Sequence, residues 1–255
     1  MNNEESPRDL SARMRELDPE RRAALVRKLK NRRTTGPQRR PLTSPTVLSY
    51  EQERLWLLDQ LTPGLTAYNA SRVLHLEGPV NVNAIQRALN GIVERHEVLR
   101  TRVDTVDGAA TPSIGPPRPV DLEVVDLETG RPVEMHDAIT VVQHFLARPF
   151  DLSGDLLLRG LLLRLKTDDH VLALCVHHIA SDGTSRQLLL DDLQFLYRGY
   201  AEGESEPTLE PPELQFSDVA AWQRDQLSAS RMLDHGSFWT EYLAGAPPTI
   251  DLPFD

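Results

Sequence analysis

The sequence predicts an α/β protein in which helices cover a mixed sheet. One observation is the stretch Leu156–His178, where two apolar runs flank a polar turn at Thr167–Asp169. In the second run both alternating sets of side chains are apolar, as in a central strand that is covered on both faces. The other observation is that amphipathic helical segments, with apolar residues three and four positions apart, separate the strand-like segments. This order is typical of a sheet with helices packed on it.

The elements after residue 46 follow from their periodicity. Helices are predicted where apolar residues recur at helical spacing, and strands where they alternate or run together. In chain order we expect a helix at 49–61, a strand at 70–78, a helix at 83–96, strands at 99–108 and 121–127, a helix at 136–147, the two strands of 156–178, and helices at 188–200, 217–229 and 237–246.

The first 40 residues differ from the rest in charge. They contain 12 Lys and Arg against 6 Asp and Glu, a balance of +6, and because the whole chain carries −10 the remainder carries −16. Two amphipathic patterns within residues 8–33 predict short helices with narrow apolar stripes and basic faces. A Pro- and Thr-rich linker follows at 34–46. We therefore predict a helical docking or linker segment at 1–40, with a solvated tail as the alternative, and a domain at 46–255.

Composition argues against several classes of protein. An acidic body argues against nucleic acid as the main partner, and no apolar run reaches the roughly 18 residues of a membrane span. The single cysteine, Cys175, lies in an apolar run and cannot form an internal disulfide. We interpret it as a core residue of a protein from a reducing compartment. We expect a cytoplasmic protein that binds neither nucleic acid nor a membrane.

Two adjacent histidines, His177 and His178, end the predicted central strand. Successive strand residues point to opposite faces, so one histidine is expected inside the structure and the other at a cleft. Three interpretations are open at this point. The pair can be ordinary strand-end residues; His178 and Asp182 can bind a metal, with His170 as the nearest further ligand in sequence; or one histidine can act as a general base in acyl transfer. In the last case the aspartate would pair with an arginine and fix the turn.

Several motifs narrow these interpretations. HHIASDG, residues 177–183, resembles the HHxxxDG signature of the acyltransferase superfamily that has the chloramphenicol acetyltransferase fold. RHEVLRTRV at 95–103 and LSYEQERLWLLDQL at 48–61 resemble two signatures of nonribosomal peptide synthetase condensation domains. The chain from about residue 46 to 255 is therefore identified as a member of that family, and it resembles the N-terminal lobe. Further runs typical of the family occur at 150–165, 216–227 and 238–248.

The resemblance implies a reaction and partners. Condensation domains have two similar lobes, and they join an acyl or peptidyl thioester on one carrier protein to the amine of an aminoacyl thioester on another, for example in antibiotic biosynthesis. It implies no metal and no cofactor bound by this chain, but phosphopantetheine arms on partner carrier proteins. Residues 1–40 would contact an upstream synthetase subunit. No segment matches the second lobe, a carrier protein or an adenylation domain, so we expect the isolated chain to need the missing second lobe or downstream modules for activity.

The resemblance also assigns roles to residues. It places His178 at the reacting centre, as a base or as a positioner of the amine, and gives His177 a structural role. Asp182 would pair with Arg100, or with Arg95 as the second choice. The supporting residues predicted at the site are therefore His177, Asp182, Gly183, Arg100 and Arg95, of which Gly183 would leave room for substrate.

The sequence departs from the family motifs at two positions, and two alternative functions stay open. Glu51 replaces the alanine of the opening motif, and Val103 replaces the final phenylalanine of the arginine motif. We interpret Glu51, Gln52 and Trp56 as parts of an ordinary helix that runs from surface to core.

The alternative functions are a non-catalytic docking or interaction fragment of a synthetase and, with less support from the arginine motif, a coenzyme A-dependent acyltransferase.

Overall fold

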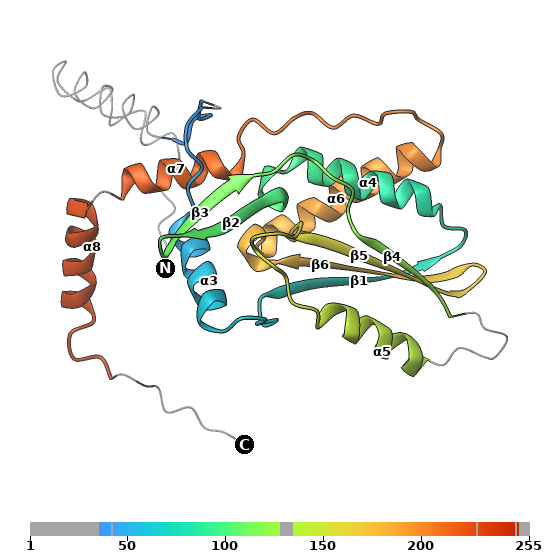
Figure 1. Ribbon diagram of the computed structural model, residues 1–255, viewed down its shortest axis with the longest axis horizontal. Coiled ribbons are helices and arrows are strands. Elements are labelled where there is room, and N and C mark those ends of the chain that lie inside the picture. Colours follow the sequence, from blue (N-terminus) through green and yellow to red (C-terminus); the bar gives the residue numbers. More distant parts are fainter. Residues whose placement is uncertain (1–35, 42, 128–134, 228, 248, 250–255) are drawn as a thin grey trace, which may run out of the picture. The chain divides into compact units, whose positions relative to one another are not determined.

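The computed structural model describes residues 36–41, 43–127, 135–227, 229–247 and 249 (Figure 1). The chain divides into two compact units, 1–38 and 39–255, and every described helix and strand belongs to the second unit. The helices predicted within 8–33 lie outside the described residues. Arg40, which we assigned to the docking segment, belongs to the second unit, where its backbone N–H donates to the Asp218 carboxylate over 3.0 Å.

A four-stranded mixed sheet forms the centre of the second unit. Its order is β1 (Asn69–Glu77), β6 (Asp169–His177), β5 (Leu158–Lys166) and β4 (Leu122–Asp126). Strand β6 is antiparallel to both β1 and β5, whereas β4 is parallel to β5. The inner strands β5 and β6 are almost completely buried, as their apolar runs predicted. The predicted α/β class with a mixed sheet is confirmed.

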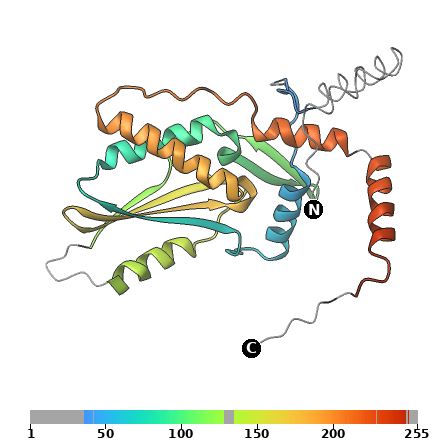
Figure 2. The ribbon, with the colours of Figure 1, turned by 180° about the vertical axis from the view of Figure 1, so that it is seen from behind.

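Helices cover both faces of this sheet. Helices α4 (Val82–Arg95) and α6 (Gly183–Ala201) pack against each other on one face, and α5 (Met135–Leu146) lies on the other face (Figures 1 and 2). A Cβ at Gly160, in the middle of β5, would lie 3.0 Å from a Leu122 methyl and 3.3 Å from a Leu89 methyl. The glycine therefore lets α4 approach the sheet closely.

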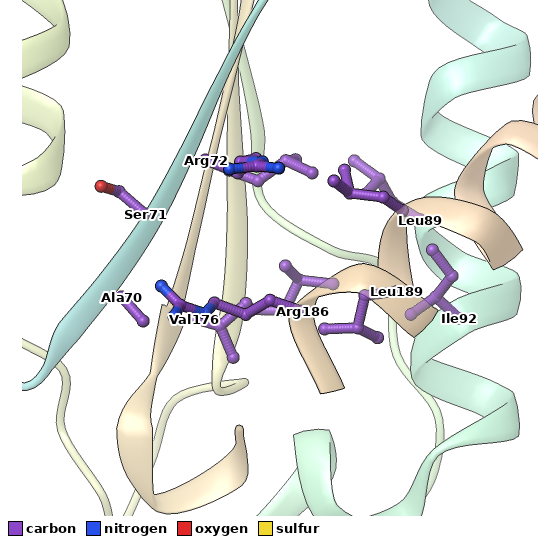
Figure 3. A pocket seen from close by; sticks show the side chains of 11 residues that line it. Ala70, Ser71, Arg72, Leu89, Ile92, Val176, Arg186 and Leu189 are labelled. Carbon is purple, nitrogen blue, oxygen red and sulfur yellow. The ribbon is translucent and has the colours of Figure 1, made fainter. Parts of the chain in front are cut away.

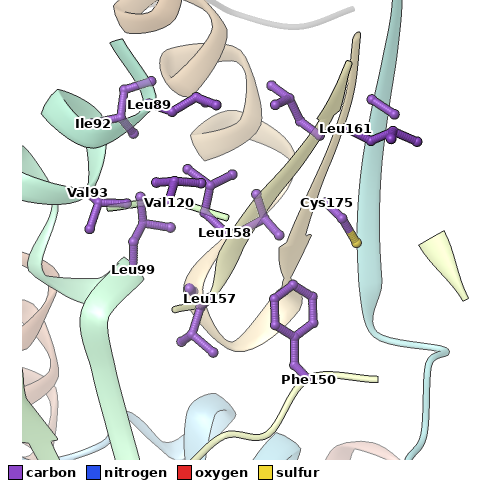
Figure 4. Packing of buried hydrophobic residues seen from close by; sticks show 14 of the residues in the cluster. Leu89, Ile92, Val93, Leu99, Val120, Phe150, Leu157, Leu158, Leu161 and Cys175 are labelled. Atoms are coloured by element: carbon purple, nitrogen blue, oxygen red, sulfur yellow. The ribbon is translucent and has the colours of Figure 1, made fainter. Parts of the chain in front are cut away.

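The inner strands and α4 share one apolar core (Figure 4). Leu89, Leu161 and Leu163 have no exposed surface, and burial of each such side chain stabilises the fold by about 1.5–3 kcal/mol. Cys175 is also fully buried, which confirms its predicted place in the core. Burial raises the pKa of its thiol, although the nearby Arg159 guanidinium opposes this shift. The uncharged thiol packs as a small apolar group.

A short helical turn and a hairpin follow α4. The 3-10 turn η1 (Glu97–Arg100) leads into β2 (Thr101–Val106) and β3 (Ala109–Ile114), which form a separate two-stranded sheet. Asp107 and Gly108 both have positive φ, 50° and 78°, as the two central residues of a tight hairpin turn require. The predicted strand at 99–108 thus begins two residues too early. We did not predict β3, because its few apolar residues give no strand signal.

Four elements complete the unit: α3 (Tyr50–Leu61), η2 (His178–Ala180), α7 (Phe216–Gln226) and α8 (Ala229–Tyr242). Helix α3 contacts η2, and α7 contacts η1, so both helices lie beside short turns that carry predicted site residues. Helix α8 begins earlier than the predicted 237–246. Within the described ranges, no helix is both long and apolar enough to cross a membrane.

Candidate functional site

His177 is buried at the end of β6, with 2% of its surface exposed. Its Nδ1 accepts a hydrogen bond from the Ile179 backbone N–H over 3.1 Å, so the proton of the neutral ring lies on Nε2. The rings of Tyr68 and Phe150 flank it edge-on, at centroid distances of 6.4 and 5.8 Å. Burial, with neighbouring His178 as a smaller cause, lowers the pKa of His177 to about 4. The ring is neutral near pH 7 and holds the turn that follows it.

His178 has the opposite environment, because it is exposed and lines a pocket of about 510 Å³. Its backbone N–H donates to the Tyr68 carbonyl over 2.8 Å, which continues the pairing of β6 with β1 past the end of the strand. The pocket is lined by residues of α3, the start of α6 and α7, among them Leu188 and Phe216. Its volume lies within the range of about 300–1,000 Å³ that is usual for small-molecule sites.

Asp182 is the N-cap of α6. Its Oδ1 accepts hydrogen bonds from the Ser185 backbone N–H at 2.7 Å and from the Ser185 hydroxyl at 2.6 Å. These bonds lower the pKa of the Asp182 carboxyl. The residue is exposed, so water and the helix N-terminus stabilise its charge, and no buried cation is needed.

The predicted pairing of Asp182 with Arg100 or Arg95 is therefore wrong. The Arg100 guanidinium donates instead to the carbonyls of Val93 at 3.2 Å and Gly115 at 2.6 Å. Arg95, the second choice, pairs with Asp192, with Nε and Oδ2 3.1 Å apart. Both arginines stabilise the end of α4 and the segment after it, and neither forms an ion pair with Asp182 among the described residues.

Sequence reasoning missed the partner of His96. Its Nε2 lies 2.8 Å from Oδ2 of Asp192, the same atom that Arg95 contacts. This group joins the end of α4 to the middle of α6. His96 also lines the pocket that contains His178. The sequence shows only that Arg95 and His96 end an amphipathic helix. This pattern does not indicate that Asp192, much later in the chain, is their partner.

The geometry does not support the metal interpretation. His170 lies near the beginning of β6, whereas His178 and Asp182 follow its end, so these three side chains do not meet. Within the part of the chain that the structure describes, no group of three His, Cys, Asp or Glu side chains could hold a metal ion. Gly183 begins α6, and apart from its chain neighbours and the backbone of its own helix, a Cβ built there would meet no atom within 4 Å. That Gly183 leaves room for substrate stays a prediction.

Sequence reasoning also missed α7 as a wall of the pocket. Gln215, just before this helix, accepts a hydrogen bond from the Glu97 backbone N–H at 3.1 Å and donates to the Arg95 carbonyl at 3.0 Å. At the other end of α7, the Arg224 Nε donates to the Leu48 carbonyl over 2.8 Å. Helix α7 is therefore tied both to the arginine motif and to the start of α3.

A second hollow lies between the sheet and the two helices α4 and α6 (Figure 3). Leu89, Ile92 and Leu189 line it, and Arg72 and Arg186 also contribute side chains. Its volume of about 30 Å³ is little more than the space of one water molecule. The larger pocket at His178 is therefore the candidate functional site.

Comparison with known proteins gives a consistent result. The family model described as the condensation domain matches residues 44–255. The chain is 40% identical to the phosphinothricin tripeptide synthetase PhsC of Streptomyces viridochromogenes, over 97% of this chain and 23% of that protein. It is 37% identical to the malpinin synthetase of Mortierella alpina, over 82% of this chain and 3% of that protein.

Solved structures show the same relationship. The X-domain from teicoplanin biosynthesis, in its complex with OxyB, superimposes with a TM-score of 0.74 at 30% identity, over 87% of this chain and 48% of that chain. The first condensation domain of the calcium-dependent antibiotic synthetase, in complex with a substrate analogue, gives a TM-score of 0.70 at 26% identity, over 82% and 50%. The chain thus spans about half of these solved structures and less than a quarter of the two synthetases.

Proposed function

Because the chain belongs to the condensation-domain family, we propose that it forms the half of such a domain that carries the reacting histidine. The complete domain would join a thioester to an amine and produce an amide. The contrast between the two histidines carries this proposal: His177 is buried, whereas His178 is exposed in a pocket of about 510 Å³. A buried strand that ends in one anchored and one accessible imidazole is a rigid support for a reacting group.

In the proposed reaction the amine nitrogen attacks the thioester carbonyl carbon, the C–N bond forms and the C–S bond breaks. The amine loses a proton and the leaving sulfur gains one, so an amide and a thiol result without any other reactant. The His178 imidazole accepts that proton or hydrogen-bonds the amine and holds it in line. A positioned base contributes about 10²–10⁴-fold, and alignment of two reactants gives an effective molarity of about 10⁵–10⁸ M.

We further propose that both substrates arrive on phosphopantetheine arms of carrier proteins, as they do for condensation domains in general. A reaction chamber that excludes water needs a second wall, and the other half of a condensation domain would supply it. On this proposal the 255 residues alone are inactive, residues 1–40 dock onto an upstream synthetase subunit, and the reaction takes place in the cytoplasm.

One alternative is a non-catalytic interaction fragment. Its support is the likeness to the teicoplanin X-domain, which was solved in complex with another protein, OxyB. The accessible His178 in a pocket favours the catalytic proposal, because a surface that only docks needs no imidazole in a cavity. The coenzyme A-dependent alternative has no support beyond the seven-residue motif at 177–183.

Reconstitution distinguishes these functions. This chain is supplied with the second half of a condensation domain and two loaded carrier proteins, and the product is identified by mass spectrometry. The proposal predicts an amide that depends on both carriers. Binding to another synthetase protein without any amide would favour the interaction fragment, and product from acyl-coenzyme A without a carrier would favour the third function.

A further inference from the structure

Gln52 is a buried polar residue of α3, with 7% of its surface exposed. Its Oε1 accepts a hydrogen bond from the Ser49 backbone N–H over 3.0 Å, and its Nε2 donates to the Ile179 carbonyl over 3.0 Å. The Ser49 N–H is only a donor and the Ile179 carbonyl is only an acceptor, so the amide group has one possible orientation. Gln52 therefore links the beginning of α3 to the residue directly after His178.

The turn that carries His178 is held by three segments of the chain. The His178 backbone N–H is bonded to the Tyr68 carbonyl at 2.8 Å, and the Ile179 N–H is bonded to His177 Nδ1 at 3.1 Å. The Ser181 N–H donates back to the His178 carbonyl at 3.3 Å, which closes the turn. Through Gln52, α3 supplies the partner of the Ile179 carbonyl. The backbone on both sides of the imidazole is thereby held in place.

We propose that Gln52 is a positioning residue for His178. Gln52 lines the same pocket as His178, and in this role it acts through the backbone: it fixes the Ile179 peptide, and this peptide sets the direction in which the His178 side chain leaves the turn. A buried carbonyl that loses its donor rotates to find another partner, because an unpaired polar group in the interior is unfavourable. Such a rotation would move the imidazole, and a displacement of about 1 Å in a reacting group can lower a rate about 10²-fold. The inference rests on the proposed function of His178.

The competing explanation is that Gln52 only stabilises α3. The Gln52 N–H donates to the Ser49 hydroxyl at 3.2 Å, and together with the bond to Oε1 this forms a capping box. Gln52→Glu separates the two roles. A glutamate keeps the acceptor that the capping box needs, but it has no N–H for the Ile179 carbonyl. Gln60→Glu is the matched control, because it adds the same charge to the exposed end of α3, outside the pocket.

The first measurement uses this chain alone and does not depend on activity. Nuclear magnetic resonance spectra report the Cε1–H signal of the His178 ring and the hydrogen exchange of the Ile179 and Ser181 amides. We expect Gln52→Glu to shift the ring signal and to speed exchange of these amides at least about tenfold at about pH 7.5, and Gln60→Glu to change neither. An unchanged ring signal and unchanged exchange in Gln52→Glu would overturn the inference.

The second measurement uses the chain supplied with the second half of a condensation domain and loaded carriers. We expect Gln52→Glu to lower kcat about tenfold with KM for the carriers within about twofold, and Gln52→Asn, which is one methylene too short, not to restore the rate. A purely structural role would lower the melting temperature and leave kcat of the folded fraction unchanged, which would contradict positioning. If Gln52→Glu moves the His178 signal while His178→Ala leaves kcat intact, the proposed function of His178 fails and the positioning by Gln52 stands.

Discussion

The Nε2 atom of His96 lies 2.8 Å from the Oδ2 atom of Asp192, although 96 residues separate them in the chain. The same carboxylate oxygen is 3.1 Å from the Arg95 guanidinium. All three side chains are largely buried, with 16–25% of their surface exposed. One carboxylate thus joins the end of α4 to the middle of α6, the two helices that cover one face of the sheet.

We expect Asp192→Ala to lower the free energy of unfolding by about 1.5–3 kcal/mol, because two charge-assisted hydrogen bonds lose their acceptor. The control is Asp191→Ala, since Asp191 accepts a hydrogen bond from Gln187 one turn away on the exposed side of the helix; it should change stability by no more than about 0.5 kcal/mol. Urea denaturation near pH 7 measures both variants. Equal losses in the two variants would show that the contact is not stabilising.

Because His177 is buried, we expect the protein to lose stability in acid. Burial lowers its pKa to about 4 from the ordinary 6.5, so between these values the unfolded chain binds a proton that the folded protein does not. Above pH 6.5 the neutral ring makes its full contribution to the free energy of unfolding. As the pH drops from 6.5 towards 4, this contribution decreases by a total of about 3 kcal/mol.

Replacement of His177 by Gln removes the titrating group and should flatten this part of the pH profile, although the variant is less stable near pH 8 because it loses the Nδ1 acceptor for Ile179. Denaturation of both proteins at several pH values between about 4 and 8 gives the comparison. A parallel pH dependence in the two proteins would assign the acid sensitivity to other groups.

Because Asp182 is the N-cap of α6, we expect its carboxylate to stabilise this helix and not to interact with Arg100. Asp182→Ala should lower the free energy of unfolding by about 0.5–2 kcal/mol, and Asp182→Ser by much less, because serine also accepts the bond from the Ser185 N–H. A double-mutant cycle between Asp182 and Arg100 should give a coupling energy near zero, since the two side chains have different partners. A coupling above about 1 kcal/mol would restore the ion pair that we first predicted.

Deletion of residues 1–38 tests the proposed docking segment. Arg40 is left in place because its bond to Asp218 belongs to the second unit. We expect the shortened chain to keep its melting temperature and to bind an upstream carrier-bearing subunit more weakly. Exposed charge pairs contribute only about 0–1 kcal/mol each, so the predicted apolar stripes should supply most of the affinity. Isothermal titration at low and high salt measures it; unchanged affinity would exclude a docking role.

The parts of the fold that sequence reasoning predicted well are those with a strong local period. We placed α4 at 83–96, and it spans Val82–Arg95. The apolar residues of this helix and of the two inner strands recur with periods that fit few other structures. The hairpin strand β3 was missed, because an edge strand with alternating small and polar residues resembles a loop.

The candidate site was harder to predict because its contacts join distant segments. Gln52 and Ile179 are 127 residues apart, and a single side-chain hydrogen bond leaves no period in the sequence. For Asp182 a local signal was present: an aspartate directly before a helix is a usual N-cap. The resemblance led us to expect an arginine partner instead, and the exposure of the Asp182 carboxylate, which makes such a partner unnecessary, depends on the whole fold.

The His178 imidazole, on the proposed function, takes part in amide formation. The direct test is kcat for amide formation by His178→Ala, measured with the second half of the domain and loaded carriers, next to His144→Ala, an exposed histidine of α5. We expect kcat to fall about 10²–10⁴-fold in His178→Ala at an unchanged melting temperature, and to stay within about twofold in His144→Ala. A His178→Ala protein that keeps more than half of the rate would contradict it.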